Sequence, residues 1–185
     1  MNSTGDCRKL SISTRIQHRS PSERPHAIDW NKQRDEWLSY LDALYKKIQE
    51  LLHDYVKAGH ILLRYQDVQL NEEEIGAYIA RRLIIKIGGK EIVAEPIGTL
   101  LIGTKGCVDV TGPTGSTRFM LVGKDASRPR VSVTIQSNPR RPPAPEPPAP
   151  PIDWTWKIVT SPPTVRYIDL TQDSLFRALL EVGGG

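Results

Sequence analysis

The sequence contains little cysteine and no long apolar run. Only two cysteines, Cys7 and Cys107, occur among its 185 residues. One lies in a segment with few apolar side chains and the other in a strand-like run, so we predict no disulfide and a reducing, cytoplasmic location. No apolar run approaches the roughly 18–20 residues that a membrane-spanning helix needs, and we therefore expect no membrane partner.

Residues 1–27 are also poor in apolar side chains, and they carry five Lys or Arg against two Asp or Glu. Such a segment cannot bury enough surface to offset its conformational entropy, so we predict a flexible basic tail. It lacks the apolar core of a secretory signal peptide. A transit peptide is the alternative, because the segment is rich in Ser and Arg, although it contains Asp6 and Glu23, and such peptides avoid acidic residues.

The spacings typical of catalytic and cofactor sites are missing as well. Residues 112–117 have glycines only three apart, no lysine after Gly115 and a strand-like run behind them, which predicts a hairpin turn rather than a phosphate-binding loop. Cys107 has no histidine in a catalytic signature beside it, and the consecutive glutamates 72–74 point in different directions. We predict no catalytic, cofactor-binding or metal-binding residue. An enzyme whose site is assembled from distant residues stays the third functional hypothesis.

What the sequence does contain is one long helical pattern. Apolar side chains recur at spacings of three and four between Trp37 and Ala58, with Asp29 as a candidate N-cap and Gly59 as a candidate end, which predicts an amphipathic helix over residues 30–58. Its heptad-like spacing favours pairing with a second copy. Further apolar residues widen the stripe and favour packing on the chain's own sheet. The interaction face would consist of Trp37, Leu41, Leu44, Ile48 and Leu51.

From Ile61 onward the pattern changes to short extended runs that are separated by glycines at intervals of about ten residues. Alternation of apolar and polar side chains in several of these runs predicts a half-buried antiparallel sheet of six or seven strands, rolled into a small barrel or sandwich. Together with the long helix, this gives an α+β fold class for residues 28–138.

Residues 139–151 contain eight prolines in thirteen positions. This composition predicts a polyproline II spacer, and Pro142, Pro145, Pro148 and Pro151 would share one edge of its threefold helix. Recognition of that edge by an aromatic groove is the alternative. Residues 152–182 predict a strand and a short helix that return across the spacer and dock on the sheet, because so short a piece cannot fold alone.

Positive charge is concentrated between residues 81 and 141, where eleven Lys or Arg face four Asp or Glu. If the cations share one sheet face, they form a patch for nucleic acid. Aromatic residues that would stack on bases are scarce in this stretch. The patch would comprise Arg81, Arg82, Lys86, Arg118, Arg128 and Arg130.

These features favour a non-catalytic protein-interaction or accessory protein that self-associates or acts within a complex. Its partner would be a second copy or another protein. A nucleic-acid-binding protein that uses residues 81–141 is the second hypothesis.

Overall fold

The computed structural model describes residues 29–99, 104–128, 152–160 and 164–184. The predicted tail, residues 1–27, and the predicted spacer, residues 139–151, lie outside these ranges. The elements in chain order are α1 (Trp30–Leu51), α2 (His53–Lys57), β1 (Ile61–Glu72), β2 (Gly76–Ile87), β3 (Lys90–Gly98), β4 (Gly106–Gly112), β5 (Gly115–Gly123), β6 (Trp154–Val159), β7 (Tyr167–Asp169) and α3 (Gln172–Gly183).

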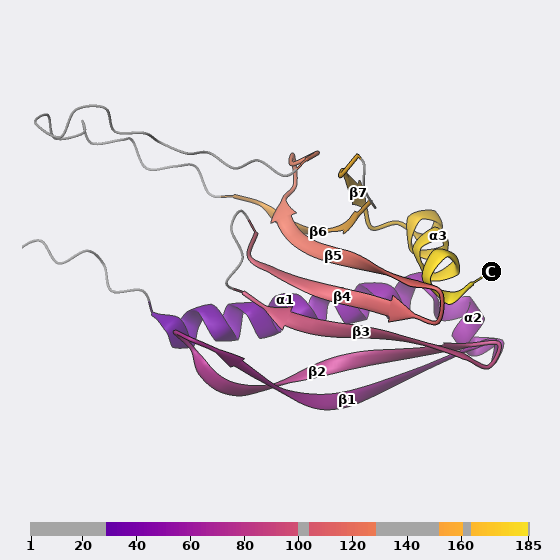
Figure 1. Cartoon of the computed structure of the whole chain (residues 1–185), viewed down its shortest axis with the longest axis horizontal. Helices are drawn as coiled ribbons and strands as arrows, with labels where there is room; N and C mark the ends of the chain where they lie inside the picture. Colours follow the sequence, from indigo (N-terminus) through magenta and orange to yellow (C-terminus); the bar gives the residue numbers. More distant parts are fainter. Residues whose placement is uncertain (1–28, 100–103, 129–151, 161–163, 185) are drawn as a thin grey trace, which may run out of the picture.

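All seven strands form one antiparallel sheet in the order β1-β2-β3-β4-β5-β6-β7, so each strand pairs with its neighbour in the sequence (Figure 1). Connections of this kind need only hairpins or short loops. β6 pairs with β5 from Arg118↔Val159 to Gly123↔Trp154, across the stretch between residues 128 and 152. The domain boundaries themselves stay a prediction.

The predicted fold class is wrong. Strands account for 46% of the described residues, and they form one sheet with β1 and β7 at its edges rather than a small barrel packed on a long helix. The predicted helix over residues 30–58 ends at Leu51, and a separate short helix, α2, follows. The predicted helix is interrupted at Leu52. This residue leaves the helical path with φ −101° and ψ 4°, and its side chain is fully buried.

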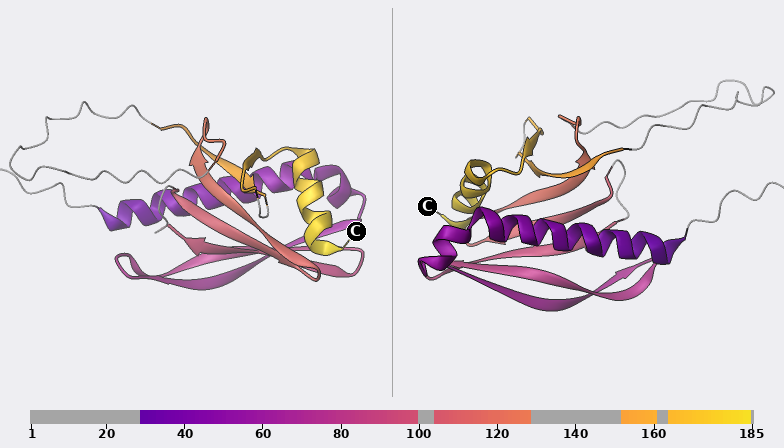
Figure 2. Two further views of the ribbon diagram at one scale, coloured as in Figure 1. Left: turned by 45° about the horizontal axis from the view of Figure 1, so that its top comes forward. Right: turned by 180° about the vertical axis from the view of Figure 1, so that it is seen from behind.

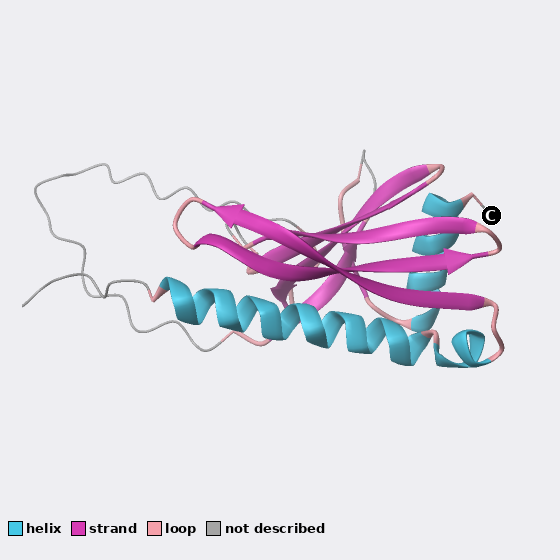
Figure 3. Cartoon of the chain, turned by 90° about the horizontal axis from the view of Figure 1, so that it is seen from below, coloured by secondary structure: helices cyan, strands magenta, loops and turns pink. Residues whose placement is uncertain are grey.

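α1 lies across one face of the sheet (Figures 2 and 3). Its N-cap Asp29 accepts a hydrogen bond from the amide of Lys32, which satisfies one of the free amides of the first turn. The face toward the sheet joins one hydrophobic cluster with Leu83, Val108 and Phe119 of the strands. The buried side chains of α1 are Trp37, Leu41, Leu44, Tyr45 and Ile48.

The hairpin of β1 and β2 extends beyond the rest of the sheet. These strands pair from Ile61↔Ile87 to Glu72↔Gly76, whereas β2 pairs with β3 only from Leu83 to Ile87. The side of β2 that faces the core changes along the strand. Ala80 and Leu83, three residues apart, are both buried, although the register with β1 is continuous. A strong twist explains this change, and two-stranded ribbons twist more than wide sheets. Figure 1 shows the two strands crossing.

α3 covers the end of the sheet near the β4–β5 turn. Thr171 caps the helix by accepting a hydrogen bond from the amide of Ser174, whose hydroxyl accepts one from the amide of Thr171 in return. Leu175, Leu179 and Val182 of α3 are buried in the same core cluster. Within the described residues, no helix combines the length and the apolar character needed to cross a membrane.

Candidate functional site

The helix face that the sequence predicts for interaction lies inside the chain's own core. Trp37, Leu41, Leu44 and Ile48 are each exposed by 1% or less, and Leu51 is half-buried. A second copy could reach the first four side chains only if the fold opened. Their burial is therefore explained by the single chain.

The predicted basic patch is divided between the two faces of the sheet. Adjacent residues of a strand point to opposite faces. Arg81 faces α1, where its guanidinium lies 2.6 Å from the carboxylate of Asp42. Arg82 and Arg118 lie on the opposite face, since each precedes a buried residue, Leu83 or Phe119.

Carboxylates also neutralise most of the patch. Arg118 makes two hydrogen bonds to Asp109, of 2.5 and 2.9 Å, and Arg82 lies 3.4 Å from Glu95. Lys86 pairs with a cross-strand glutamate at 3.2 Å. Arg128 is exposed, and Arg130 lies outside the described residues. The four paired residues therefore do not form one cationic surface.

Two surface hollows beside α1 share the side chain of Tyr40. The first has a volume of about 500 Å³ and the second of about 510 Å³. The first is lined by Asp29, Lys32, Gln33, Glu36, Trp37, Tyr40, Thr99, Thr104 and Lys105. The second is lined by Tyr40, Ala43, Lys47, Leu121, Lys124, Trp154, Thr155, Trp156, Asp169 and Leu170. We call the two together the aromatic groove.

Three of the chain's four tryptophans line this groove, and they come from α1 and β6. Trp154 and Trp156 are two residues apart on β6, so their side chains point to the same side of the strand. Trp156 is 8% exposed. Its indole N–H donates to the carbonyl of Tyr40 at 2.9 Å, and its ring centroid lies 6.0 Å from that of Trp37. Trp156 thus fixes β6 against α1.

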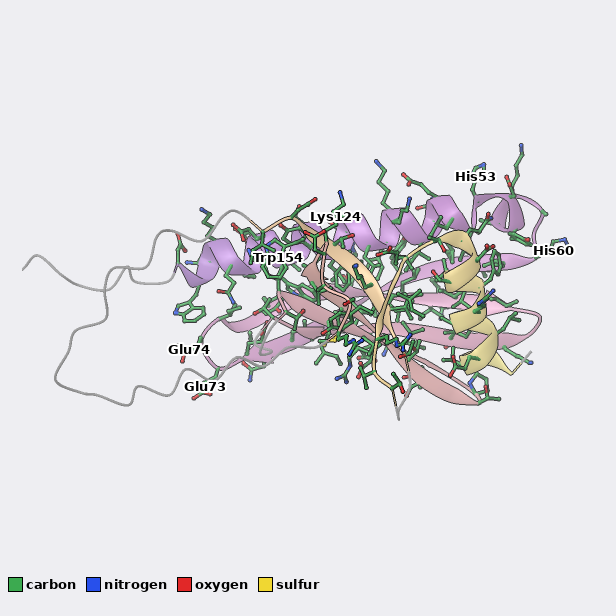
Figure 4. All side chains as sticks on the ribbon, turned by 90° about the horizontal axis from the view of Figure 1, so that it is seen from above. His53, His60, Glu73, Glu74, Lys124 and Trp154 are labelled. Atoms are coloured by element: carbon green, nitrogen blue, oxygen red, sulfur yellow. The ribbon has the colours of Figure 1, made fainter. Side chains whose placement is uncertain are left out.

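Trp154 and Tyr40 present half-buried rings at the surface of the groove. Figure 4 shows Trp154 beside α1, next to Lys124. The ammonium of Lys105 lies 5.6 Å from the ring centroid of Trp154 and 5.9 Å from that of Tyr40, within the range of cation–π attraction. The same ammonium lies 2.7 Å from the carboxylate of Glu36. The hydrogen bond from Lys105 holds the pKa of the Glu36 carboxyl below its usual value.

A buried carboxylate, Glu72, binds Thr99, which lines the first hollow. Glu72 accepts hydrogen bonds from the amide of Thr99 at 2.8 Å, from the hydroxyl of Thr99 at 2.9 Å, and from the hydroxyl of Tyr78. Burial, together with this bond to Glu72, raises the pKa of the Tyr78 hydroxyl. Gln33 of α1 donates to the Thr99 hydroxyl at 3.3 Å. This network ties the far end of the β1–β2 ribbon to the groove.

The structure gives the other chemistry candidates ordinary structural roles. Residues 112–117 form the predicted hairpin, closed by the pair Gly112↔Gly115 between β4 and β5. Cys107 is fully buried, and burial raises the pKa of its thiol to about 11, which makes it a poor nucleophile at neutral pH. Among the described residues, no group of three or more His, Cys, Asp or Glu could hold a metal ion.

Sequence reasoning missed the groove. Tyr40 is not part of the predicted interaction face, and its contact with Trp156 joins residues 116 positions apart. The alternation of Trp154 and Trp156 predicts a strand, but it does not indicate which helix that strand meets. The concentration of three tryptophans in two short segments is the one feature that could have suggested an aromatic site.

Comparisons with known proteins give no match, since no family model, no curated protein and no solved structure corresponds to this chain.

Proposed function

We propose that this chain is a non-catalytic protein-interaction module that binds an extended, proline-rich segment in the aromatic groove. The observation that carries the proposal is the pair of half-buried rings, Tyr40 and Trp154, held beside the surface by Lys105 and by the buried Trp156. Proline-rich segments adopt polyproline II helices, and these dock on aromatic-lined grooves because little conformational entropy is lost.

The groove also offers hydrogen-bond donors for such a ligand. Polyproline II backbone has no internal hydrogen bonds, so its carbonyl groups need external donors. Within the described part of the chain, the hydroxyl of Tyr40 and the indole N–H of Trp154 have no hydrogen-bond acceptor, and both are half-buried. Tyrosine and tryptophan therefore supply a flat apolar surface and a polar group at the same place.

This proposal keeps the interaction function expected from the sequence but changes its surface. The apolar stripe of α1 is buried in the core, and Arg81, Arg82 and Arg118 pair with carboxylates, so neither surface supports binding as the groove does. The partner is a protein segment, and we place the interaction in the cytoplasm, in keeping with the free, buried Cys107.

A peptide titration tests the proposed function. The probe is a fluorescently labelled synthetic peptide with the sequence of residues 139–151. Because the chain carries that sequence itself, the titrated protein is a variant with Pro142→Ser, Pro145→Ser, Pro148→Ser and Pro151→Ser, which we call the open variant. We expect saturable binding, measured by fluorescence anisotropy, and quenching or shift of the tryptophan emission.

Substitutions in the open variant locate the binding surface. Trp154→Ala should weaken peptide binding at least about tenfold, equivalent to about 1.4 kcal/mol, whereas Trp154→Tyr should retain most of it. Tyr55→Ala is the matched control, because this exposed aromatic residue lies outside the groove, against Phe176 of α3. Equal loss in the Trp154 and Tyr55 variants, or no saturable binding at millimolar peptide, contradicts the proposal.

A further inference from the structure

We infer that the aromatic groove is occupied by the chain's own proline-rich segment, residues 139–151, bound in cis. This inference rests on the proposed function. It adds that the site regulates itself, because a partner segment must compete with an internal one. Three observations carry it: the attachment point of the segment, its length, and the position of its proline edge.

The segment is attached at the groove itself. It ends at Pro151, three residues before Trp154. The chain is fixed there, since the amide of Lys124 donates to the carbonyl of Asp153 at 2.8 Å and Gly123 pairs with Trp154 across β5 and β6. On the other side of the segment, β5 ends at Gly123, and the carbonyl of Ser127 accepts a hydrogen bond from the amide of Tyr167 at 3.1 Å. The end of the segment is therefore anchored beside the second hollow, which Lys124 and Trp154 line.

The segment is longer than the helix stretch that lines the two hollows, so it can cover both. Thirteen residues in polyproline II conformation span roughly 40 Å at 3.1 Å per residue. The lining residues of α1 and its N-cap run from Asp29 to Lys47, which is roughly 27 Å at 1.5 Å per residue.

The proline edge ends close in sequence to the half-buried ring of Trp154. Pro142, Pro145, Pro148 and Pro151 recur every third residue, and this period places them on one edge of a polyproline II helix, roughly 9 Å apart. The last of them, Pro151, is the one nearest in sequence to Trp154. A tethered segment also has an effective concentration of about 1 mM, so an affinity that is weak in solution suffices for occupancy in cis.

The test compares the affinity of the native chain with that of the open variant for the labelled peptide of residues 139–151. If the peptide binds the open variant with a Kd of about 0.1 mM, a competing internal segment at about 1 mM weakens binding to the native chain about tenfold. The control variant carries Pro143→Ser, Pro147→Ser and Pro150→Ser, which lie off the proposed edge. It should bind the peptide as weakly as the native chain does.

The outcomes separate this inference from the proposed function. Tighter binding by the open variant supports both. Equal binding by the native chain and the open variant overturns occupancy in cis and leaves the groove as a peptide site. Binding by neither protein overturns both. Light scattering on the same samples tests whether the segment of a second copy occupies the groove. A native chain that is a dimer and an open variant that is a monomer would assign the segment to a second copy. That result overturns occupancy in cis.

Discussion

At the scale of single residues, backbone conformation explains where the chain turns. Gly88 and Gly89 connect β2 to β3 with φ values of +54° and +81°, and the flanking residues Ile87 and Lys90 pair across the hairpin. Two-residue hairpin turns of this type require positive φ at both central positions, which glycine adopts without steric cost. The paired glycines between two apolar runs therefore predict this hairpin directly.

The environments of the three consecutive glutamates, by contrast, do not follow from the local sequence. Glu72 is buried at the end of β1, whereas Glu73 and Glu74 are exposed at the tip of the ribbon (Figure 4). Identical neighbours in the sequence thus have different environments. The difference depends on Thr99, which is 27 residues away and donates twice to the Glu72 carboxylate.

Glu72→Ala should therefore lower the free energy of unfolding by about 2–3 kcal/mol, because it leaves the buried donors of Thr99 and Tyr78 without their acceptor. Glu73→Ala is the matched control and should change it by less than about 0.5 kcal/mol. Urea denaturation of both variants measures the two values. Similar losses in the two variants would show that the carboxylate of Glu72 does not stabilise the ribbon.

At the scale of elements, local sequence patterns predict whether an element is a helix or a strand better than they predict where it begins and ends. The apolar period that predicts a helix over residues 30–58 continues past Leu51, where α1 ends. Leu52 follows the period, four residues after Ile48, and its side chain is fully buried, so the apolar pattern does not mark the end of α1. A helical period therefore predicts that a helix is present more reliably than where it ends.

The contact between α3 and the β4–β5 turn depends on one missing side chain. A Cβ atom on Gly112 would overlap the carbonyl of Val182, whereas one on Gly115 would meet no atom within 4 Å. The amide of Thr114 donates to that same carbonyl at 3.0 Å. The close approach of helix and turn therefore requires glycine at the first position only.

Gly112→Ala should lower the free energy of unfolding by about 1–3 kcal/mol, because α3 must shift away from the turn. Gly115→Ala should change it by less than about 0.5 kcal/mol. Thermal denaturation of the two variants, followed by circular dichroism, makes the comparison. A stable Gly112→Ala variant with unchanged α3 contacts would contradict this account of the packing.

At the scale of the whole molecule, stability should be distributed unevenly over the open sheet. β4 is paired on both sides, and α1 and α3 cover its core face. The ribbon formed by residues 66–81 has only two strands, and most of its side chains on β1 are exposed. Regions with few buried contacts open locally at a lower free energy than the core.

Native-state hydrogen exchange should reveal this gradient. We expect the amides of β4 and β5 to exchange most slowly and those of the ribbon between Gln66 and Arg81 to exchange faster, with intermediate rates in the part of β2 that pairs with β3. Mass spectrometry of peptic fragments, or NMR, measures the rates. Uniform protection across β1 and β4 would show that the ribbon unfolds only together with the core.

The sequence by itself determined the local features of this protein: a helix that begins after Asp29, glycine hairpins, strands with alternating side chains and a capped helix at the end of the described chain. These follow from short-range dihedral preferences and hydrophobic periods. Tertiary structure alone decided that the sheet stays open, that the apolar face of α1 is buried in the core, and that Arg82 and Arg118 pair with carboxylates of neighbouring strands. The aromatic groove belongs to this second class, because it joins Tyr40 to Trp154 and Trp156 through the pairing of β5 with β6, and strand pairing depends on contacts between residues far apart in the sequence.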